Sequence, residues 1–345
     1  MKLTFAGDFS LGDRYLQRLQ RRKPGSSAYR RLLEDPMRFV TALRPLFGGD
    51  RIGIVNLETV LTRASVSPLE GRKDYLGQDD PGRTIAVLQA LGVWGVSLAN
   101  NHSKDFGDAG LLETMHHLAI GGIRFFGAGD KAGARMPCYV GMAAGRPVYV
   151  IASMQYRARY AREYDYFAHG AQVGVDSFDP NSMARRIRAL RQREAKAWII
   201  VFPHWGRNYR MRDDAMRAAA EAWVRAGADL ILGHGAHALQ ECDCVSGVPV
   251  CYSLGNVVFN SPGRYRQHGM HPYSAIAQVE LETDRLSLRL YPTLTDNRVT
   301  DYQVALAQHT QAAECAARVL SADYALQKDA FGWHFAMEQP ERTVR

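Results

Sequence analysis

The sequence has few cysteines and no long apolar run, and each absence excludes a class of protein. Its 345 residues include five scattered cysteines, an odd number that does not suggest a disulfide framework and that favours a reduced, cytoplasmic chain. No stretch of about 18 apolar residues occurs, so we expect no membrane-spanning helix. The opening residues MKLTFAGDFSLGD lack the apolar core of a secretory signal, so no signal peptide is expected.

Lysine is also scarce for so basic a protein. Only seven of its 43 basic residues are lysine and the remaining 36 are arginine, in a chain of net charge +8. Arginine forms bidentate contacts with carboxylates and phosphates, so this excess favours an acidic or peptidic substrate. No nucleic-acid-binding motif accompanies the charge, and no nucleic-acid partner is expected. Nothing in the sequence indicates an oligomeric state.

Short apolar runs alternate with amphipathic stretches along about 290 residues. The apolar runs predict strands that are covered on both faces. These strands are expected at 2–6, 52–56, 95–99, 123–126, 148–152, 198–203, 229–232, 249–253, 275–281 and 286–291. Helices are expected at 109–120, 182–196, 214–226 and 303–320. The alternation predicts an α/β protein, and the last two strands, which have no helix between them, predict mixed sheets.

We expect one domain over residues 1–300, followed by a C-terminal helical extension and tail over 301–345. Residues 18–38, 63–84 and 155–181 contain few apolar runs and predict long surface segments. Segments of this kind at strand ends usually carry specificity, so the second and third are expected to shape a substrate pocket.

Polar side chains follow six of the predicted strands, at the point where each strand ends. They are Asp8; Asn56 and Glu58; Asn100, Asn101, His102 and Asp105; His204; His234 and His237; and Ser253 and Asn256. Each alone has an ordinary explanation, such as a turn residue or a buried histidine. Because function gathers at the carboxyl ends of strands in α/β sheets, we expect them to share one rim. Their oxygen and imidazole donors suit one or two divalent ions such as Mn, Zn or Fe.

Other histidines and cysteines fit this site less well. His116 and His117 lie within a predicted helix, and His268 and His271 lie in a Gly- and Arg-rich loop, so all four are expected to be solvated. The CDC of 242–244 does not have a usual zinc spacing.

Six motifs resemble those of the CapA family in order and approximate spacing. They are GDFSLG, NLETVLT, the stretch from SLANNHSKDFG to FFGAG, HWGRNY, GADLILGHGAHALQ and YSLGNVVF. That family is associated with poly-γ-glutamate capsule biosynthesis and belongs to the calcineurin-like metallophosphatase superfamily. The resemblance runs from about residue 2 to about residue 290. It implies a metallo-dependent phosphatase-like fold, a four-layer α/β/β/α sandwich with two metals at one rim.

The resemblance also implies individual roles. One metal would be held by Asp8, Glu58 and His237. The other would be held by Glu58, Asn101, His204 and His234, with Glu58 bridging. Catalytic roles are expected for His102, which would protonate a leaving group, and for Asp105, His204 and Arg207. Substrate contacts are expected from Asn56, Asn100, Asn208, Ser253 and Asn256.

Several positions depart from the family pattern. Ser10 stands where the superfamily has a histidine, and Gly235 and Ala236 stand where the family usually has His and Pro. Asn208 replaces a glutamate, and Val60 replaces a proline. Changes around the ligands can weaken metal binding severely, so a site with little or no metal is an alternative.

Three functions are therefore open. The first is a metal-dependent hydrolase of a phosphoester, or of an acidic or γ-glutamyl-type peptide amide. The second is a metal-independent peptide-modifying isomerase, a Cα epimerase in which His102, Glu58 and His204 would move the proton. The third is a non-catalytic subunit that binds an acidic polymer in poly-γ-glutamate-like biosynthesis.

Overall fold

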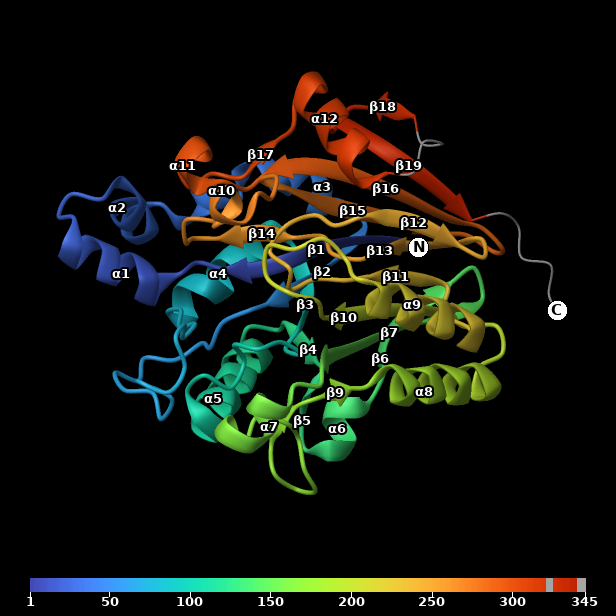
Figure 1. Ribbon diagram of the computed structural model, residues 1–345, viewed down its shortest axis with the longest axis horizontal. Coiled ribbons are helices and arrows are strands. Elements are labelled where there is room, and N and C mark those ends of the chain that lie inside the picture. Colours follow the sequence, from blue (N-terminus) through green and yellow to red (C-terminus); the bar gives the residue numbers. More distant parts are fainter. Residues whose placement is uncertain (321–324, 340–345) are drawn as a thin grey trace.

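Two large β-sheets pack face to face, and helices cover the outer side of each sheet (Figure 1). The structure is a computed structural model that describes residues 1–320 and 325–339. A third, two-stranded sheet pairs β5 (Ala128–Gly129) with β8 (Gly174–Val175). The α/β/β/α arrangement with mixed sheets confirms the predicted fold class.

The first sheet has ten strands, with a parallel part and an antiparallel part. Its order is β18 (Leu326–Lys328), β19 (Trp333–Gln339), β16 (Leu286–Leu294), β15 (Tyr273–Leu281), β1 (Lys2–Ser10), β2 (Arg51–Leu57), β3 (Val93–Ser97) and β4 (Arg124–Phe126). Two further strands join it: β14 (Asn256–Phe259) pairs with β1, and β17 (Ala305–Leu306) pairs with β16. The strands from β1 to β4 are parallel, so their carboxyl ends lie at one edge.

The second sheet has seven strands. Its order is β12 (Cys242–Val245), β13 (Val248–Cys251), β11 (Leu230–Leu232), β10 (Trp198–His204), β7 (Arg146–Gln155) and β6 (Cys138–Ala143), with β9 (Ser177–Phe178) on β7. The central strands β13, β11, β10 and β7 are parallel. All ten predicted strands are present in the two large sheets, within a few residues of the expected bounds.

Helices connect the strands and cover the sheets. The α-helices are α1 (Asp13–Arg22), α2 (Ser27–Glu34), α3 (Arg44–Phe47), α4 (Pro81–Leu91), α5 (Gly107–Ile120), α6 (Lys131–Arg135), α7 (Ala158–Tyr164), α8 (Pro180–Arg193), α9 (Asp214–Ala226), α10 (Tyr265–His268), α11 (Asn297–Thr300) and α12 (His309–Val319). Two 3-10 helices, η1 (Pro36–Phe39) and η2 (Thr41–Leu43), precede α3. Local sequence explains the start of α8. Asp179 is the N-cap and forms a reciprocal capping box with Ser182, and Pro180 stands at the first helical position. None of the helices in the described residues is both long enough and apolar enough to cross a bilayer.

Three apolar cores account for the four layers. Residues such as Phe5 of the first sheet and Phe202 of the second meet between the sheets, where their ring centroids lie 5.5 Å apart. A second core packs the outer face of the first sheet against α1, α2, α4 and α5. A third packs the outer face of the second sheet against α8 and α9. Strands buried on both faces explain why their sequences are continuous apolar runs.

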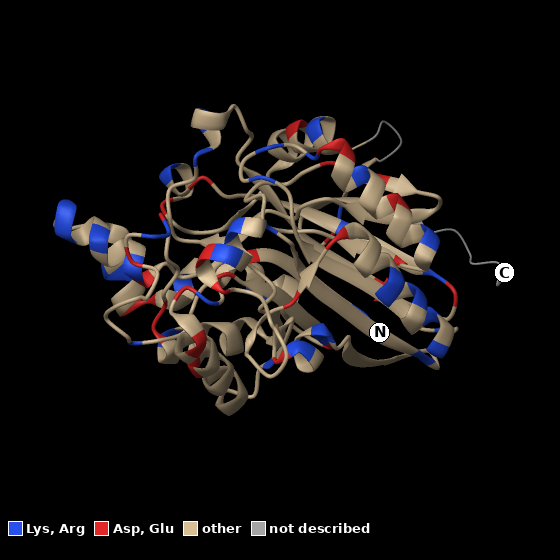
Figure 2. Cartoon of the chain, turned by 60° about the horizontal axis from the view of Figure 1, so that its bottom comes forward, with Lys and Arg blue, Asp and Glu red and all other residues tan. Residues whose placement is uncertain are grey.

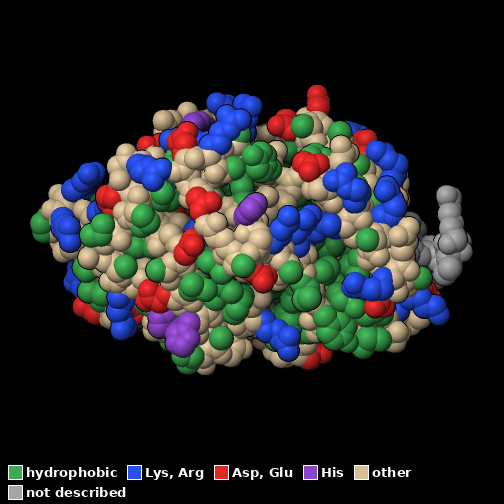
Figure 3. Space-filling view, turned by 90° about the horizontal axis from the view of Figure 1, so that it is seen from below, with side chains coloured by type: hydrophobic (Ala, Val, Ile, Leu, Met, Phe, Trp, Pro, Cys, Tyr) green, Lys and Arg blue, Asp and Glu red, His purple; other side chains and the backbone are tan. Residues whose placement is uncertain are grey.

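Charged residues lie mainly on the outer helices and loops, while the strands of the sheets contain few of them (Figure 2). On the face shown in Figure 3, basic side chains form several separate groups between acidic and apolar ones. The arginine excess therefore forms no continuous basic stripe on this face.

The structure adds detail to one expected segment and corrects another. Residues 18–38, expected as a long surface segment, are mostly exposed or half-buried and are largely helical in α1, α2 and η1. The helix expected at 303–320 begins only at His309, because Ala305 and Leu306 pair with β16 instead. The domain division at residue 300 stays a prediction. The segment after it is not only helix and tail, however, because β19 pairs along β16 and extends the first sheet.

Candidate metal centre

Five predicted ligands meet in the buried interior at the carboxyl ends of β1, β2, β10 and β11. Two groups of donor atoms form there, and within each group the atoms all lie within 4.8 Å of one another. The first group is Asp8, His204 and His234, and the second is Asp8, Glu58 and His237. Asp8 is thus the carboxylate common to both groups, whereas the resemblance implied that Glu58 bridges. The ligand roles themselves stay predictions.

Strand register brings these residues together. Asp8 of β1 lies beside Asn56 of β2, and the backbone of His204 pairs with that of His234 just after β11. The Nδ1 atoms of those two histidines lie 3.1 Å apart. Parallel strands therefore bring to one place side chains that are far apart in the sequence, as the rim argument expected.

The GHGAH turn is shaped to place its histidines. Gly235 has φ 100°, and a Cβ there would lie 2.7 Å from Cε1 of His204. Glycine at this position thus gives the imidazole of His204 its space, and the histidine usual in the family could not fit without a shift. His237 has φ 63°, a left-handed conformation that is uncommon for residues other than glycine. Such strain is found preferentially at functional sites.

An amide network holds the two carboxylates. Asn56 Nδ2 donates to Asp8 Oδ1 at 2.9 Å and to Glu58 Oε2 at 3.3 Å. Asn100 Nδ2 in turn donates to Asn56 Oδ1 at 2.9 Å. Asn56 and Asn100 were expected to contact substrate, but both are fully buried and bonded within the protein. Their hydrogen bonds fix the position of the carboxylates, and a contact of either residue with substrate stays a prediction.

The pKa values of Glu58 and Asp8 shift in opposite directions. Burial raises the pKa of Glu58 well above its ordinary value, and the neighbouring charge of Asp8 raises it further. Burial also acts to raise the pKa of Asp8, but hydrogen bonds and charges of His234 and His237 outweigh it and hold that pKa well below the ordinary value. Two buried carboxyl groups this close together repel each other when both are ionised, so a cation between them is favourable.

Two polar atoms of the cluster, and one of the predicted ligand Asn101, are left unpaired. Glu58 Oε1, Asn101 Oδ1 and His234 Nε2 are buried without a hydrogen-bond partner in the described residues. Leaving such an atom unpaired costs about 1–3 kcal/mol each. All three atoms are of the carboxylate, amide-oxygen and imidazole types that coordinate divalent ions. The residues present therefore fit a divalent metal.

His102 lies at the edge of the cluster in a chain of polar contacts. Its Nδ1 is 2.6 Å from Asp105 Oδ2, and its Nε2 is 3.9 Å from Glu58 Oε1. Asp105 also forms an ion pair with Lys73 and accepts a hydrogen bond from Gly77 N at 2.6 Å. Burial and the charge of Lys73 lower the pKa of His102, while Asp105 opposes them. Asp105 thus fixes the ring so that Nδ1 faces the carboxylate and Nε2 faces the centre.

Lys73 was not among the predicted site residues. It lies in the 63–84 segment, and its only signal in the sequence is that it is one of seven lysines. Gly77 of the same segment passes close to the centre, because a Cβ on it would lie 3.4 Å from His102 Cβ. Tyr75 stacks under Arg264, whose guanidinium carbon is 4.7 Å from the ring centroid. This segment therefore borders the centre.

His237 is held at the same ring nitrogen that faces the cluster, since its Nδ1 lies 3.2 Å from Asp8 Oδ2. Its Nδ1 lies 2.9 Å from Asn256 Oδ1, and Asn256 Nδ2 donates to the hydroxyl of Tyr265 at 3.2 Å. Asn256 was expected to contact substrate, but it orients His237. Ser253 is buried, and its Oγ accepts from Gly255 N at 3.1 Å, so it shapes a turn rather than facing a ligand.

Arg207 and Asn208 are exposed, and their side chains form no hydrogen bond or ion pair within the described part of the chain. A different arginine reaches this turn: Arg157 Nη2 donates to Gly206 O at 2.6 Å. Burial lowers the pKa of His204 well below its ordinary value, and the charges of His234 and Arg157 contribute. The 155–181 segment thus contacts the turn that follows β10.

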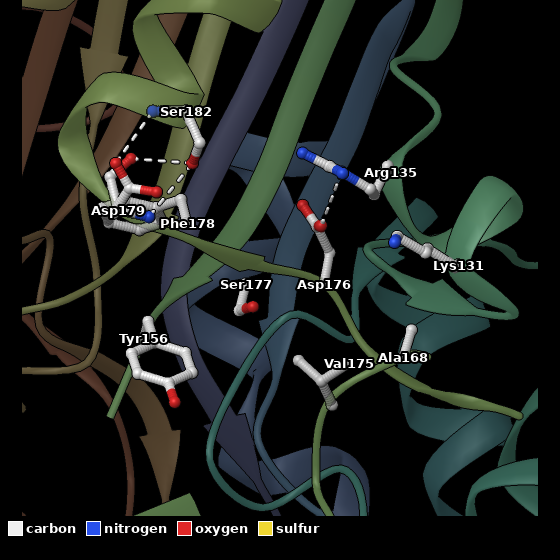
Figure 4. A pocket seen from close by; sticks show the side chains of 10 residues that line it. All are labelled: Lys131, Arg135, Tyr156, Ala168, Val175, Asp176, Ser177, Phe178, Asp179 and Ser182. Atoms are coloured by element: carbon white, nitrogen blue, oxygen red, sulfur yellow. Dashed lines mark hydrogen bonds and ion pairs between the residues drawn. The ribbon is translucent and has the colours of Figure 1, made fainter. Parts of the chain in front are cut away.

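A pocket of about 370 Å³ opens beyond the end of β7 (Figure 4). Its lining includes Lys131, Arg135, Tyr156 and Asp176, but no member of the metal cluster. Asp176 is already paired with Arg186 at 2.5 Å. Residues of the 155–181 segment line this pocket, and the expectation that the segments 63–84 and 155–181 shape a substrate pocket stays a prediction.

The expectation of solvent exposure was wrong for one histidine outside the cluster. His271 was expected to be solvated, but it is buried, and burial lowers its pKa to about 4. By contrast, His116 is exposed as expected.

Comparisons with known proteins agree on a family. The sequence matches the family described as Bacterial capsule synthesis protein PGA_cap over residues 2–261. It is 29% identical over 207 residues to the capsule biosynthesis protein CapA of Bacillus anthracis, covering 56% of this chain and 48% of that protein. It is 31% identical over 251 residues to a probable polyglutamine synthesis accessory protein of Mycobacterium tuberculosis, covering 70% of this chain and 61% of that protein. The aligned part thus spans between about half and under two thirds of these relatives' length.

Among solved structures, a phosphatase from Mycoplasma pneumoniae is similar at 12% sequence identity. The alignment covers 88% of this chain and 90% of that one, with a TM-score of 0.37. Similarity at this level carries no argument about activity, which has to come from the site itself.

Proposed function

This chain belongs to the PGA_cap family of bacterial capsule synthesis proteins, and from the geometry of its site we propose that it is a metal-dependent hydrolase with a dinuclear centre. Its substrate would be a phosphoester or an acidic, γ-glutamyl-type peptide amide. The observation that carries the proposal is the pair of buried donor groups that share Asp8. The unpaired atoms of Glu58, Asn101 and His234 support the proposal further, because they are possible metal ligands that have no hydrogen-bond partner among the described residues.

In this proposal the metals are held by Asp8, Glu58, Asn101, His204, His234 and His237. Divalent ions bound there would polarise the scissile group and activate water for attack. Asn56 keeps the two carboxylates at a fixed separation, and Asn256 keeps the ring of His237 turned toward Asp8. The chain therefore supplies a site whose geometry is largely set before any ligand arrives.

His102 is the group that would exchange a proton with the substrate. Its Nδ1 is engaged by Asp105, so Nε2 is the atom available on the side of Glu58. A proton delivered from Nε2 to the departing oxygen or nitrogen would complete hydrolysis. Lys73 keeps Asp105 ionised, because its charge helps to hold the pKa of that carboxyl below the ordinary value against burial.

The substrate class follows from the relatives and from charge. The names of the curated relatives refer to capsule biosynthesis and to polyglutamine synthesis, and this chain has a net charge of +8. The names favour a polymer or a fragment of one, and the positive net charge favours an anionic ligand. In this proposal, carboxylate groups of the substrate would be met by Arg157, which contacts the turn after β10, and by Arg264, which stacks on Tyr75.

Metal analysis of protein purified without chelator tests the proposal first. We expect one or two Mn, Zn or Fe ions per chain, and hydrolysis of either a phosphodiester or a γ-glutamyl amide that chelation abolishes. The Asp8→Ala/His237→Ala double variant should lose both. Full activity in that variant, with no metal bound in the wild type, would rule out the hydrolase.

The same assays separate the alternatives. Solvent deuterium appearing at a substrate Cα without metal would identify the isomerase. Tight binding of poly-γ-glutamate without turnover would identify a non-catalytic subunit. A cytoplasmic location is part of the proposal and is tested by cell fractionation.

A further inference from the structure

Two cysteines face each other in the second sheet, behind the loop that carries His237. Cys242 of β12 and Cys251 of β13 are direct partners in an antiparallel pair. Their Sγ atoms lie 2.7 Å apart, and both residues are fully buried. Cys244 is the next cysteine along β12, but its partner is Pro249 and it is exposed.

The backbone places this pair at a position that suits a cross-link. Cys251 O accepts a hydrogen bond from Gly233 N at 2.8 Å, so its backbone groups face β11 rather than β12. Cys242 and Cys251 are therefore a non-hydrogen-bonded pair, in which the Cα atoms are about 4.5 Å apart and the side chains approach most closely. That separation lies within the range that a disulfide spans, about 4.4–6.8 Å.

The antiparallel pairing continues from the cysteines to the metal centre. Gln240 N donates to Ser253 O at 3.0 Å, and Leu239 pairs with Leu254. Two residues beyond each of these leucines lie His237 and Asn256, whose side chains are in contact. Any covalent link between the cysteines would thus restrain the two segments that present and orient His237.

We propose that Cys242 and Cys251 are a modification site, which a peroxide converts to a cross-strand disulfide that rigidifies the loop bearing His237. One thiol sulfur attacks the O–O bond, forming S–O and releasing water with the thiol proton. The second sulfur then attacks the sulfenic sulfur, forming S–S and breaking S–O, and the departing hydroxyl takes the proton of the second thiol and leaves as a second water. The two thiols lose two electrons, and one peroxide is reduced to two waters.

Burial makes this reaction slow but the product durable. It raises the pKa of the Cys242 thiol well above the ordinary value, with Cys251 contributing, so little thiolate is present. A water-sized oxidant is therefore required, and reductants would also have poor access. The disulfide should be a persistent mark of oxidation rather than a fast signal.

The experiment treats the full chain with hydrogen peroxide, blocks the remaining thiols with an alkylating agent in denaturant, and maps the linked peptides by mass spectrometry. We expect two of the five thiols to disappear, a peptide joining Cys242 to Cys251, and reversal by dithiothreitol. The link should persist in Cys244→Ser and Cys315→Ala, and it should vanish in Cys251→Ala. Cys315 shares the same core, so a link from it to either partner would overturn the assignment. Full alkylation of Cys242 and Cys251 after peroxide treatment would also overturn it.

Amide hydrogen exchange tests the effect on the loop without relying on metal or activity. In the oxidised protein, exchange around residues 237–242 and 251–256 should slow at least severalfold, and the Tm should rise by a few degrees. Cys251→Ala treated in the same way should show neither change. A disulfide that leaves these exchange rates unaltered would overturn the proposed restraint on His237.

Discussion

The two sides of the metal centre are held in different ways. On the first-sheet side, Asp8 and Glu58 are fixed by a continuous network through Asn56 and Asn100. On the second-sheet side, His204 and His234 contact mainly each other, and His237 is held in a left-handed turn by Asn256. Within the described part of the chain, each side keeps a buried atom without a hydrogen-bond partner, Glu58 Oε1 on the first and His234 Nε2 on the second, but only on the first do amide groups donate to the ligands. A bound metal is therefore expected to order the second side more than the first.

Removal of the shared carboxylate should have the largest effect. We expect Asp8→Ala to reduce the metal content to background, because Asp8 contributes to both donor groups. The value of kcat/KM for the hydrolysed substrate should fall on the order of 10³-fold. Elemental analysis and steady-state kinetics check this. Asp50→Ala is the matched control, because Asp50 is exposed and lies just before β2, at the end of the strand opposite to Glu58. It should change neither the metal content nor kcat/KM. Retention of stoichiometric metal in Asp8→Ala would contradict the shared role.

The orienting amides should separate the two sides. We expect Asn56→Ala to weaken metal binding by about 10–100-fold and also to destabilise the metal-free fold, because it leaves two buried carboxyl groups without their donor. Asn256→Ala should weaken binding similarly but affect the metal-free fold less. Isothermal titration with Mn or Zn and urea unfolding measure the two effects. Equal destabilisation of the metal-free protein by both variants would refute the contrast between the sides.

Metal affinity should rise with pH. The raised pKa of Glu58 means that this group is protonated in the metal-free protein above the pH at which glutamate normally ionises, so metal must displace a proton. We expect the apparent affinity to increase by about tenfold per pH unit until the pH passes the pKa of Glu58 in the folded protein.

The linked effect on stability has the opposite sign. Because its folded-state pKa is raised, Glu58 stabilises the metal-free protein fully only below its unfolded-state pKa, and this contribution is lost as pH rises through the folded-state pKa. Titrations with chelated and metal-loaded protein between pH 5 and 8 compare the two. A Glu58→Gln variant should lose the pH dependence of affinity, and a slope unchanged in that variant would assign the proton to another group.

The smallest expected effect concerns Lys73. We expect Lys73→Met to raise the pKa of His102, because the lysine charge disfavours a second positive charge nearby. The limb of the pH profile of kcat/KM that belongs to His102 should move to higher pH, with less than about a tenfold change at the optimum. Arg72→Met, on the same loop, is the control and should leave the limb in place. An unshifted limb in Lys73→Met would show that Lys73 only anchors the loop.

The site residues were predicted best from the ends of the predicted strands. Asp8, Glu58, His204, His234 and His237 each follow a continuous apolar run, and the structure brings all five together. Local patterns could not assign Asn56 or Asn256, because a donor that faces substrate and one that faces a neighbouring side chain have the same sequence. Lys73 escaped notice for a related reason, since its loop has no periodicity to place it against Asp105.

The sequence by itself determined the α/β class of this protein and the set of donors at the ends of its strands, while the four layers were implied by the family resemblance. Apolar runs specify buried strands, and parallel strands must end at a common edge. Only the tertiary structure decided which donors share a group, which atoms remain unpaired, and that Cys242 faces Cys251. These depend on strand register and side-chain burial, because distances between residues remote in the chain are set by packing and not by local sequence.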